Sequence, residues 1–251
     1  MPPVAAERKS ALVTGASSGI GAAIARRLAA DGWEILAAGR DAARTNALAQ
    51  PSDRIHPWVG ALANSADADR LVADCVQAFG GLDLLVNNAG IYEIADAEAT
   101  TDDAWQRTIA INLSMPFYLS RAALPHLRKR KGAIVNIASD WGLKGGANAV
   151  AYCASKGGLV LMTRAMAIDH AADGIRVNAV CPGDVETPML YRSGATRGAD
   201  AQRALREANA DSRSGRVTTP EEVAAVVAFL ASEDARQVNG AAIPIDGGGL
   251  A

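Results

Sequence analysis

The chain has 251 residues, 49% of them hydrophobic, so it is long and apolar enough to bury the core of one large domain. The chain has 25 Lys and Arg residues and 27 Asp and Glu residues, which gives a formal net charge of −2. It therefore lacks the excess of basic residues that is typical of proteins that bind nucleic acid or acidic membranes. The three cysteines lack metal-ligand spacing, and we predict neither disulfides nor a metal site. The sequence shows no apolar leader and no apolar run of membrane length, so we predict a soluble cytoplasmic protein without a membrane segment.

Short apolar runs alternate with helical patterns along the whole chain, which is typical of repeated βαβ units. The predicted strands occupy residues 11–13, 34–39, 55–59, 82–86, 133–138, 175–181 and 242–245. No linker, charge block or repeat divides the chain, so we expect one domain over residues 1–251. We therefore predict an α/β fold with a doubly wound sheet of about seven mainly parallel strands and helices on both faces.

Helical patterns fill the segments between these strands. We predict helices that end near residues 31, 79, 130, 173 and 232, with Gly32 and Gly174 as stop residues and Thr219 opening a capping box. Pro116 and Pro125 predict a bend or a break in the long helix over residues 101–130. Residues 182–199 show no periodicity and are predicted to form a loop, within a substrate lid over about residues 184–215.

A glycine-rich turn follows the first predicted strand and opens the first helix, with the sequence Thr14-Gly-Ala-Ser-Ser-Gly-Ile-Gly21. Glycines permit a tight turn and a close approach of the backbone to a pyrophosphate, and the helix N-terminus supplies free N–H groups. The alternative is a merely structural turn between strand and helix, but such a turn has no need for three glycines and two serines. The strand-turn-helix context therefore favours a nucleotide site.

Tyr152 and Lys156 lie four positions apart, on one face of the helix predicted to follow. A tyrosine phenol titrates near pH ~10 in water, and a nearby ammonium favours the phenolate, so we expect Lys156 to bring the pKa of Tyr152 toward neutrality. Ser139 ends the strand predicted over residues 133–138, where open α/β sheets bind ligands. A Tyr and a Lys at this spacing also occur as ordinary surface side chains, so the other motifs must decide between the two interpretations.

Taken together, these motifs resemble those of the classical short-chain dehydrogenase/reductase family over nearly the whole chain. The resemblance rests on residues 14–21, the run Asn87-Asn88-Ala89-Gly90, Asn112, Ser139, the pair Tyr152 and Lys156, Pro182-Gly183, and Thr187. It implies a Rossmann-type fold that binds NAD(P) and transfers hydride between the cofactor and a carbonyl or secondary alcohol. The competing interpretation is a catalytically silent NAD(P)-binding regulatory or scaffold protein, which would be expected to lose at least one catalytic position.

The resemblance also implies residue roles. Tyr152 would be the general acid or base, Lys156 would lower the pKa of Tyr152 and bind the nicotinamide ribose, and Ser139 would orient the substrate oxygen. Asn112 would hold a water that links Lys156 to solvent. The implied cofactor contacts are Gly15, Ser17, Ser18, Gly19, Ile20, Gly21, Arg40, Asn88, Ala89, Gly90, Tyr152, Lys156, Pro182, Gly183, Val185 and Thr187.

The position about 20 residues past the glycines decides between the cofactors, because an acidic side chain there favours NAD. Here Gly39 and Arg40 occupy it, and a guanidinium at position 40 would pair with a 2′-phosphate, with Ser17 as a second candidate contact. We therefore predict NADP, with NAD as second choice. Many relatives carry an Asp after the third strand to contact adenine, whereas this chain reads Gly60-Ala-Leu-Ala63.

Four apolar side chains near the predicted site are candidates for the substrate wall: Trp141, Leu143, Met189 and Tyr191. They would suit a small or medium hydroxy or keto compound, although each would serve equally well to pack the lid. Two helices, over residues 113–127 and after Tyr152, are apolar on more than one face, which favours a homotetramer or homodimer as in the family. The alternative is packing of these faces on the chain's own sheet.

Overall fold

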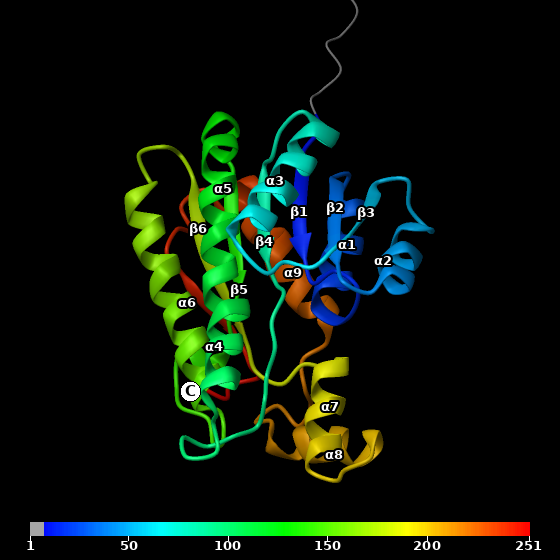
Figure 1. Cartoon of the computed structure of the whole chain (residues 1–251), viewed down its shortest axis with the longest axis vertical. Helices are drawn as coiled ribbons and strands as arrows, with labels where there is room; N and C mark the ends of the chain where they lie inside the picture. The colour runs from blue at the N-terminus through cyan, green and yellow to red at the C-terminus, as the bar shows by residue number, and fades with distance from the viewer. Residues whose placement is uncertain (1–7) are drawn as a thin grey trace, which may run out of the picture.

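A sheet of seven parallel strands forms the centre of the computed structural model, which describes residues 8–251 (Figure 1). The strand order is β3-β2-β1-β4-β5-β6-β7. The strands are β1 (Ser10–Thr14), β2 (Glu34–Gly39), β3 (Ile55–Val59), β4 (Leu84–Asn87), β5 (Ala133–Ile137), β6 (Arg176–Pro182) and β7 (Ala242–Ile245). All predicted strands are present with small shifts at their ends, and the α/β fold class is confirmed. Residues 1–7, which we include in the predicted domain and expect to hold no leader, lie outside the described residues.

The central strands are buried on both faces. In β1, Ala11 and Val13 belong to the hydrophobic core on one side of the sheet, and Leu12 belongs to the core on the other. Because successive side chains of a strand point to opposite faces, a strand covered on both sides needs an uninterrupted apolar run. This requirement explains why the predicted strands read as continuous apolar segments.

Helices cover the sheet in two layers (Figure 1). The first layer holds α1 (Gly19–Ala30) and α9 (Pro220–Ala231), which pack against each other, and α2 (Ala42–Ala49) lies near β3. The second layer holds α3 (Ser65–Phe79), α5 (Met115–Arg130) and α6 (Val150–Asp169). The capping box predicted at Thr219 is present, with Glu222 as its reciprocal partner.

The predicted long helix is divided, but the division lies before Pro116. Helix α4 (Asp102–Ile109) leads into a π-helical segment, η1 (Ala110–Ser114), and then into α5. Pro116 stands in the first turn of α5, directly after the π-helical segment, and α5 continues through Pro125 to Arg130. The π segment holds Asn112, and π turns inside helices are frequent at functional sites.

The prediction of a loop over residues 182–199 is wrong. Helix α7 (Pro188–Thr196) begins directly after Thr187 with Pro188 at its first position, and α8 (Ala201–Asp211) follows. A small apolar cluster of Leu190, Ala208 and Val217 stabilises both helices. Because these residues are far apart in the sequence, their contacts produce no local periodicity in residues 182–199. Both helices stand beyond the carboxyl ends of the strands (Figure 1). None of the helices within residues 8–251 is both long and apolar enough to cross a bilayer.

Candidate active site

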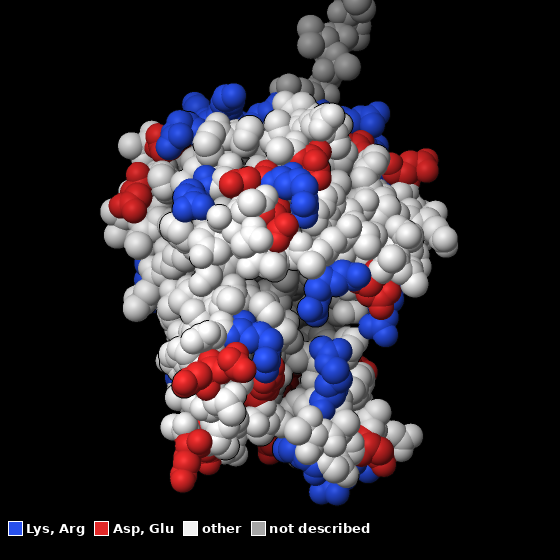
Figure 2. Space-filling model, in the orientation of Figure 1, with Lys and Arg blue, Asp and Glu red and all other residues white. Residues whose placement is uncertain are grey.

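The carboxyl ends of parallel strands lie at one edge of the sheet, and this edge carries the predicted motifs. The glycine turn follows β1, the Asn87-to-Gly90 run ends β4, Ser139 follows β5, and the Pro182-Gly183 turn ends β6. Figure 2 shows the surface hollowed between the body of the protein and the α7–α8 unit, with Lys and Arg side chains beside the hollow. Residues far apart in sequence are therefore gathered at one place.

The glycine turn after β1 is tightly packed and leaves the N-terminus of α1 without a side-chain cap. Gly15 has φ +65°, and a Cβ at this position would lie 2.9 Å from the Ala89 Cα. A Cβ on Gly21 would overlap the Gly15 carbonyl oxygen. The N-cap residue Ser18 makes no capping hydrogen bond, whereas the N-cap side chains of α2, α3 and α9 each do. The first N–H groups of α1 thus suit the pyrophosphate of a dinucleotide.

Thr14 and Asn88 connect the turns after β1 and β4. The Thr14 Oγ1 accepts from the backbone N–H groups of Asn88 at 3.0 Å and Ala89 at 3.1 Å. The Asn88 amide donates back to the Thr14 carbonyl at 2.8 Å. Thr14 opens the glycine-rich motif but is not among the predicted contact residues, since the sequence does not show that its hydroxyl bonds the turn after β4.

Asn112, Gly90 and Lys156 lie close together beside the β4 turn. The Asn112 side chain is fully buried; its Oδ1 accepts from the Ile91 N–H at 2.9 Å, and its Nδ2 donates to the Ser155 hydroxyl at 3.1 Å. A Cβ on Gly90 would lie 3.3 Å from the Asn112 Oδ1 and 3.6 Å from the Lys156 Nζ. Gly90 therefore occupies the space between these two side chains.

Tyr152 and Lys156 share one face of α6, and the Lys156 Nζ lies 5.7 Å from the Tyr152 ring centroid. The ammonium donates to the Ile137 carbonyl at 2.7 Å, and burial lowers the pKa of Lys156 to about 8. Burial also raises the pKa of Tyr152, although a hydrogen bond with Ser139 opposes this effect. The predicted shift of the Tyr152 pKa toward neutrality is thus wrong, because removal of the phenolate from water outweighs the hydrogen bond with Ser139.

Ser139 stands directly after β5 and opens the short helix η2 (Asp140–Gly142). Its Oγ donates to the Asp140 Oδ1 at 3.0 Å and accepts from the Trp141 N–H at 3.2 Å. Asp140 was not predicted as a site residue, because no sequence pattern distinguishes it from a helix-capping aspartate.

The turn after β6 reaches the glycine loop. A Cβ on Gly19 would lie 3.1 Å from the Thr187 Cγ2, so Thr187 lies against the start of α1. The Gly183 N–H donates to the Ile245 carbonyl at 3.0 Å, and Val185 forms an isolated bridge with Thr218. Of the predicted cofactor contacts on this turn, Thr187 is the one that lies against the glycine loop.

An aromatic cluster surrounds Tyr152. The Trp141 ring centroid lies 6.2 Å from that of Tyr152, and Tyr92 contacts both rings, at 5.6 Å from Trp141 and 5.1 Å from Tyr152. Tyr92 was missed in the sequence, where it follows the Asn-Asn-Ala-Gly run by two positions. Of the other predicted wall residues, Leu143 is exposed and Tyr191 donates its hydroxyl to Glu186 at 2.8 Å. Met189 lies in the first turn of α7 and is partly buried.

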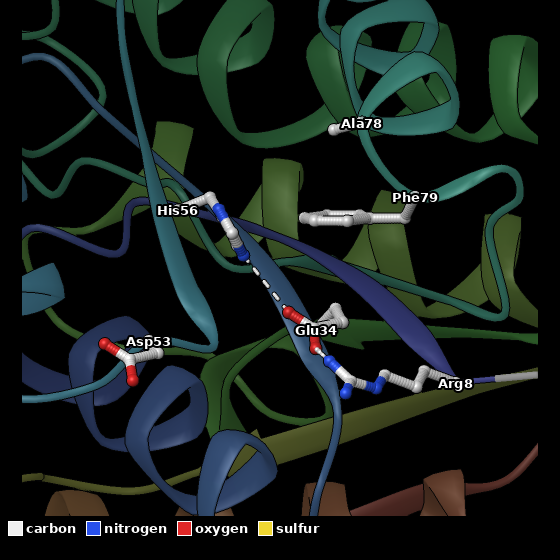
Figure 3. A pocket seen from close by; sticks show the side chains of 6 residues that line it. All are labelled: Arg8, Glu34, Asp53, His56, Ala78 and Phe79. Atoms are coloured by element: carbon white, nitrogen blue, oxygen red, sulfur yellow. Dashed lines mark hydrogen bonds and ion pairs between the residues drawn. The ribbon is translucent and has the colours of Figure 1, made fainter.

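A separate hollow of about 380 Å³ lies at the amino-terminal edge of the sheet, away from these motifs (Figure 3). Its lining residues are Arg8, Glu34, Asp53, His56, Ala78 and Phe79. The Glu34 carboxylate is already occupied, by Arg8 at 2.8 Å, Arg54 at 3.2 Å and His56 at 3.1 Å. Within residues 8–251, no three His, Cys, Asp or Glu side chains are grouped to hold a metal ion.

Comparisons with known proteins agree with this arrangement. A family model described as enoyl-(acyl carrier protein) reductase matches residues 15–249. Meso-2,3-butanediol dehydrogenase of Serratia marcescens is 40% identical, over 98% of this chain and 96% of its own length. D-beta-hydroxybutyrate dehydrogenase of Cupriavidus necator is also 40% identical, over 97% of this chain and 98% of its own length.

Solved structures also match over nearly the whole chain. Actinorhodin polyketide ketoreductase with NADPH superposes with a TM-score of 0.92 at 33% identity, covering 96% of this chain and 97% of that one. The 3-ketoacyl-(acyl-carrier-protein) reductase of Brucella melitensis complexed with NADH has a TM-score of 0.87 at 32% identity, covering 97% and 98%. Fold, motif order and relatives lead to one conclusion: the chain belongs to the short-chain dehydrogenase/reductase family of oxidoreductases.

Proposed function

We propose that the protein transfers hydride between NADP(H) and a small carbonyl or secondary alcohol compound, with Tyr152 as general acid or base. The observation that carries this proposal is the meeting of two motifs at one edge of the sheet. An uncapped helix N-terminus behind a glycine turn lies across the β4 turn from Ser139, Tyr152 and Lys156. The first suits a dinucleotide, and the second suits proton exchange with an oxygen atom.

In this proposal each side chain acts on the substrate oxygen directly or through Tyr152. Burial raises the pKa of Tyr152, so the phenol is protonated at neutral pH, and its role in this proposal is to donate that proton to a carbonyl oxygen. Ser139 hydrogen-bonds and orients that oxygen. Lys156 returns protons to Tyr152, and Asn112 holds the water that leads from Lys156 to solvent. The bound dinucleotide supplies or accepts the hydride.

For the cofactor we propose NADP. Arg40 is exposed directly after β2, and Ser17 lies beside Gly39, where a Cβ on Gly39 would be 3.1 Å from the Ser17 Cβ. That added Cβ would also overlap the Thr45 hydroxyl, so this backbone has no room for an acidic side chain at position 39. A guanidinium beside a hydroxyl supports recognition of a 2′-phosphate.

The substrate class we propose is a small hydroxy or keto compound. Relatives at 40% identity are named for butanediol and for hydroxybutyrate, and the Tyr92–Trp141 wall offers an apolar surface beside Tyr152. The test is the absorbance of NADPH, and separately of NADH, with acetoin, 3-oxobutyrate and a panel of other ketones, aldehydes and 3-oxoacyl esters, together with the reverse reaction on alcohols and sugars. Loss of NADPH with one substrate group is the expected result. Absence of turnover with both cofactors would contradict the proposal.

The second candidate function is a silent NAD(P)-binding regulatory protein. It is disfavoured because Asn112, Ser139, Tyr152 and Lys156 are all present at the positions required for catalysis. Titration of NADPH into the protein distinguishes the two functions. Tight binding without turnover of any panel compound would favour the regulatory one, and absence of binding would contradict both.

We also propose that the protein forms a homodimer or homotetramer through α5 and α6. Leu161 and Ile168 are 64% and 79% exposed, and their spacing of two helical turns places them on one face of α6. Phe117 on α5 is exposed as well. Large exposed apolar side chains are typical of interaction surfaces, and a second copy of the same two helices offers a matching face.

Replacing Ile168 with glutamate is expected to shift the protein to a smaller species, because two copies would bring buried carboxylates together across the proposed interface. Light scattering coupled to size-exclusion chromatography measures the change. Val59→Glu is the matched control, since Val59 is also exposed but lies on β3, at the other edge of the sheet. An unchanged mass for Ile168→Glu, or an equal shift for Val59→Glu, would contradict the proposed interface.

A further inference from the structure

The Trp141 indole lies with one face against the backbone of Gly146, in the loop that joins η2 to α6. A Cβ placed on Gly146 would overlap the Trp141 Cδ2 and would lie 2.6 Å from Cε2 and 2.7 Å from Cε3. Three atoms of one ring at such similar distances place the face of the indole, and not its edge, on this residue. Non-bonded carbon atoms need about 3.5–4.0 Å between their centres, so no side chain fits at position 146 while the indole stays where it is.

The reason for a glycine at position 146 is space and not backbone conformation. Gly145 and Gly146 both belong to the described residues, and neither has a positive φ, so the backbone of each would accept alanine. The two positions differ in their surroundings. Among residues 8–251, apart from its chain neighbours, nothing lies within 4 Å of a Cβ placed on Gly145. Gly146 is therefore the one of this pair that makes room for the indole.

The loop around Gly146 is held on both sides and cannot easily retreat from the indole. On the side of η2, the Lys144 ammonium donates to the Gly249 carbonyl at 3.1 Å. On the side of α6, the Asn148 carbonyl accepts from the Ala95 N–H at 2.9 Å. A side chain at position 146 would therefore displace the indole rather than the loop.

The aromatic cluster decides where a displaced indole can go. The main chain of Trp141 is fixed, because its N–H donates to the Asp140 Oδ1 at 2.9 Å, so the indole moves only by rotation of its side chain. Tyr92 and Tyr152 contact the indole at ring-centroid distances of 5.6 Å and 6.2 Å, each with an interplanar angle of 81°. Because Gly146 covers one face of the indole, these two rings lie at its other face or at its edge. Edge-to-face contacts are stabilising and keep the indole in the cluster, so an indole pushed off Gly146 moves toward the space beside Tyr152.

We propose that Gly146 is a positioning residue that sets the size of the substrate site: it lets the Trp141 indole lie back against the loop, which leaves room beside Tyr152 for substrates longer than the smallest ketones and alcohols. This proposal rests on the proposed function, whose reaction and cofactor it leaves unchanged. The carbon chain of a substrate must lie beside the phenol that exchanges a proton with its oxygen atom. A methyl group at position 146 would move the indole into this space, so long substrates should lose more than short ones.

The test uses Gly146→Ala and two series of 3-oxo esters. One series lengthens the acyl side of the ketone, from ethyl 3-oxobutanoate to ethyl 3-oxooctanoate, and the other lengthens the ester side, from methyl to butyl 3-oxobutanoate. In at least one series, the kcat/KM for the longest member relative to the shortest should fall about tenfold, the effect of one methylene group in an apolar pocket. The change should appear in the KM for the long ester, whereas the kcat for the shortest ester and the affinity for NADPH should stay unchanged. Gly145→Ala is the matched control and should change none of these quantities.

A second variant removes the indole. Trp141→Ala should raise the same ratio above the wild-type value, since the ring no longer bounds the site. In this background Gly146→Ala should have no further effect, because the three atoms nearest to the added methyl group all belong to Trp141. The two substitutions thus form a double-mutant cycle whose coupling reports the contact. The cycle also distinguishes this contact from a general loss of structure in Gly146→Ala, which would persist without the indole.

The outcomes separate the two proposals. If the wild type turns over no compound of the panel or of either series, the proposed function fails, and the role of Gly146 fails with it. If the wild type turns over a panel compound but no ester longer than the shortest, the site lacks the proposed room, and only the role of Gly146 is overturned. The same holds if Gly146→Ala leaves both ratios unchanged, raises them, or has the same effect in the Trp141→Ala background.

Discussion

Tyr152→Phe is expected to reduce turnover by about 10³-fold or more, the usual contribution of a general acid or base, while NADPH binding stays unchanged. The phenyl ring keeps the packing against Tyr92 and Trp141, at centroid distances of 5.1 Å and 6.2 Å, so the aromatic cluster is preserved. Only the hydroxyl that exchanges the proton is lost. Steady-state kinetics on the best substrate of the panel and fluorescence titration of NADPH measure the two quantities.

Tyr118→Phe is the matched control for this variant. Tyr118 lies on α5, where its ring packs edge-to-face on Phe117 at 5.8 Å, and it carries no proposed role in catalysis. Its loss of a hydroxyl should leave turnover unaffected. Near-normal activity of Tyr152→Phe would assign proton transfer to another group, and loss of NADPH binding would show that the ring and not the proton had been disturbed.

The sequence was most informative where a structure depends on neighbouring residues. Strands buried on both faces require apolar runs, and the capping box at Thr219 forms between residues three positions apart, so both were predictable. Helix α7 was not, because it is stabilised by apolar contacts with α8 and Val217, which no local pattern records. The π segment around Asn112 was missed for a similar reason, since its bonds to Ile91 and Ser155 come from other parts of the chain.

The same distinction applies to the site. The glycine turn and the spacing of Tyr152 and Lys156 are local patterns and could be found in the sequence. The contacts of Asp140, Thr14 and Tyr92 arise only when strand ends meet, and an aspartate after a strand carries no signal of its own. The direction of the Tyr152 pKa shift depends on burial, which a four-residue spacing does not determine.

Arg40→Asp is expected to change cofactor preference by about 10² toward NAD, because it removes charge-assisted bonds to a 2′-phosphate and adds a repelling carboxylate. Arg40 follows β2 in an exposed position near Ser17, and within residues 8–251 no ion-pair partner of its guanidinium is seen. Its replacement should therefore leave the fold intact. The ratio of kcat/KM for NADPH to that for NADH, measured with one substrate, reports the change.

Arg26→Asp serves as the control for charge reversal, since Arg26 is also exposed but lies on α1, beside Glu221. A long-range effect of charge would move the preference in both variants, whereas direct recognition moves it only in Arg40→Asp. If Arg40→Asp still prefers NADPH as strongly as the wild type, the phosphate is held by other residues, with Ser17 the first to replace by alanine. If instead the wild type prefers NADH, Arg40 does not decide the preference between NADP and NAD. The protein would then bind NAD without an acidic side chain at position 39.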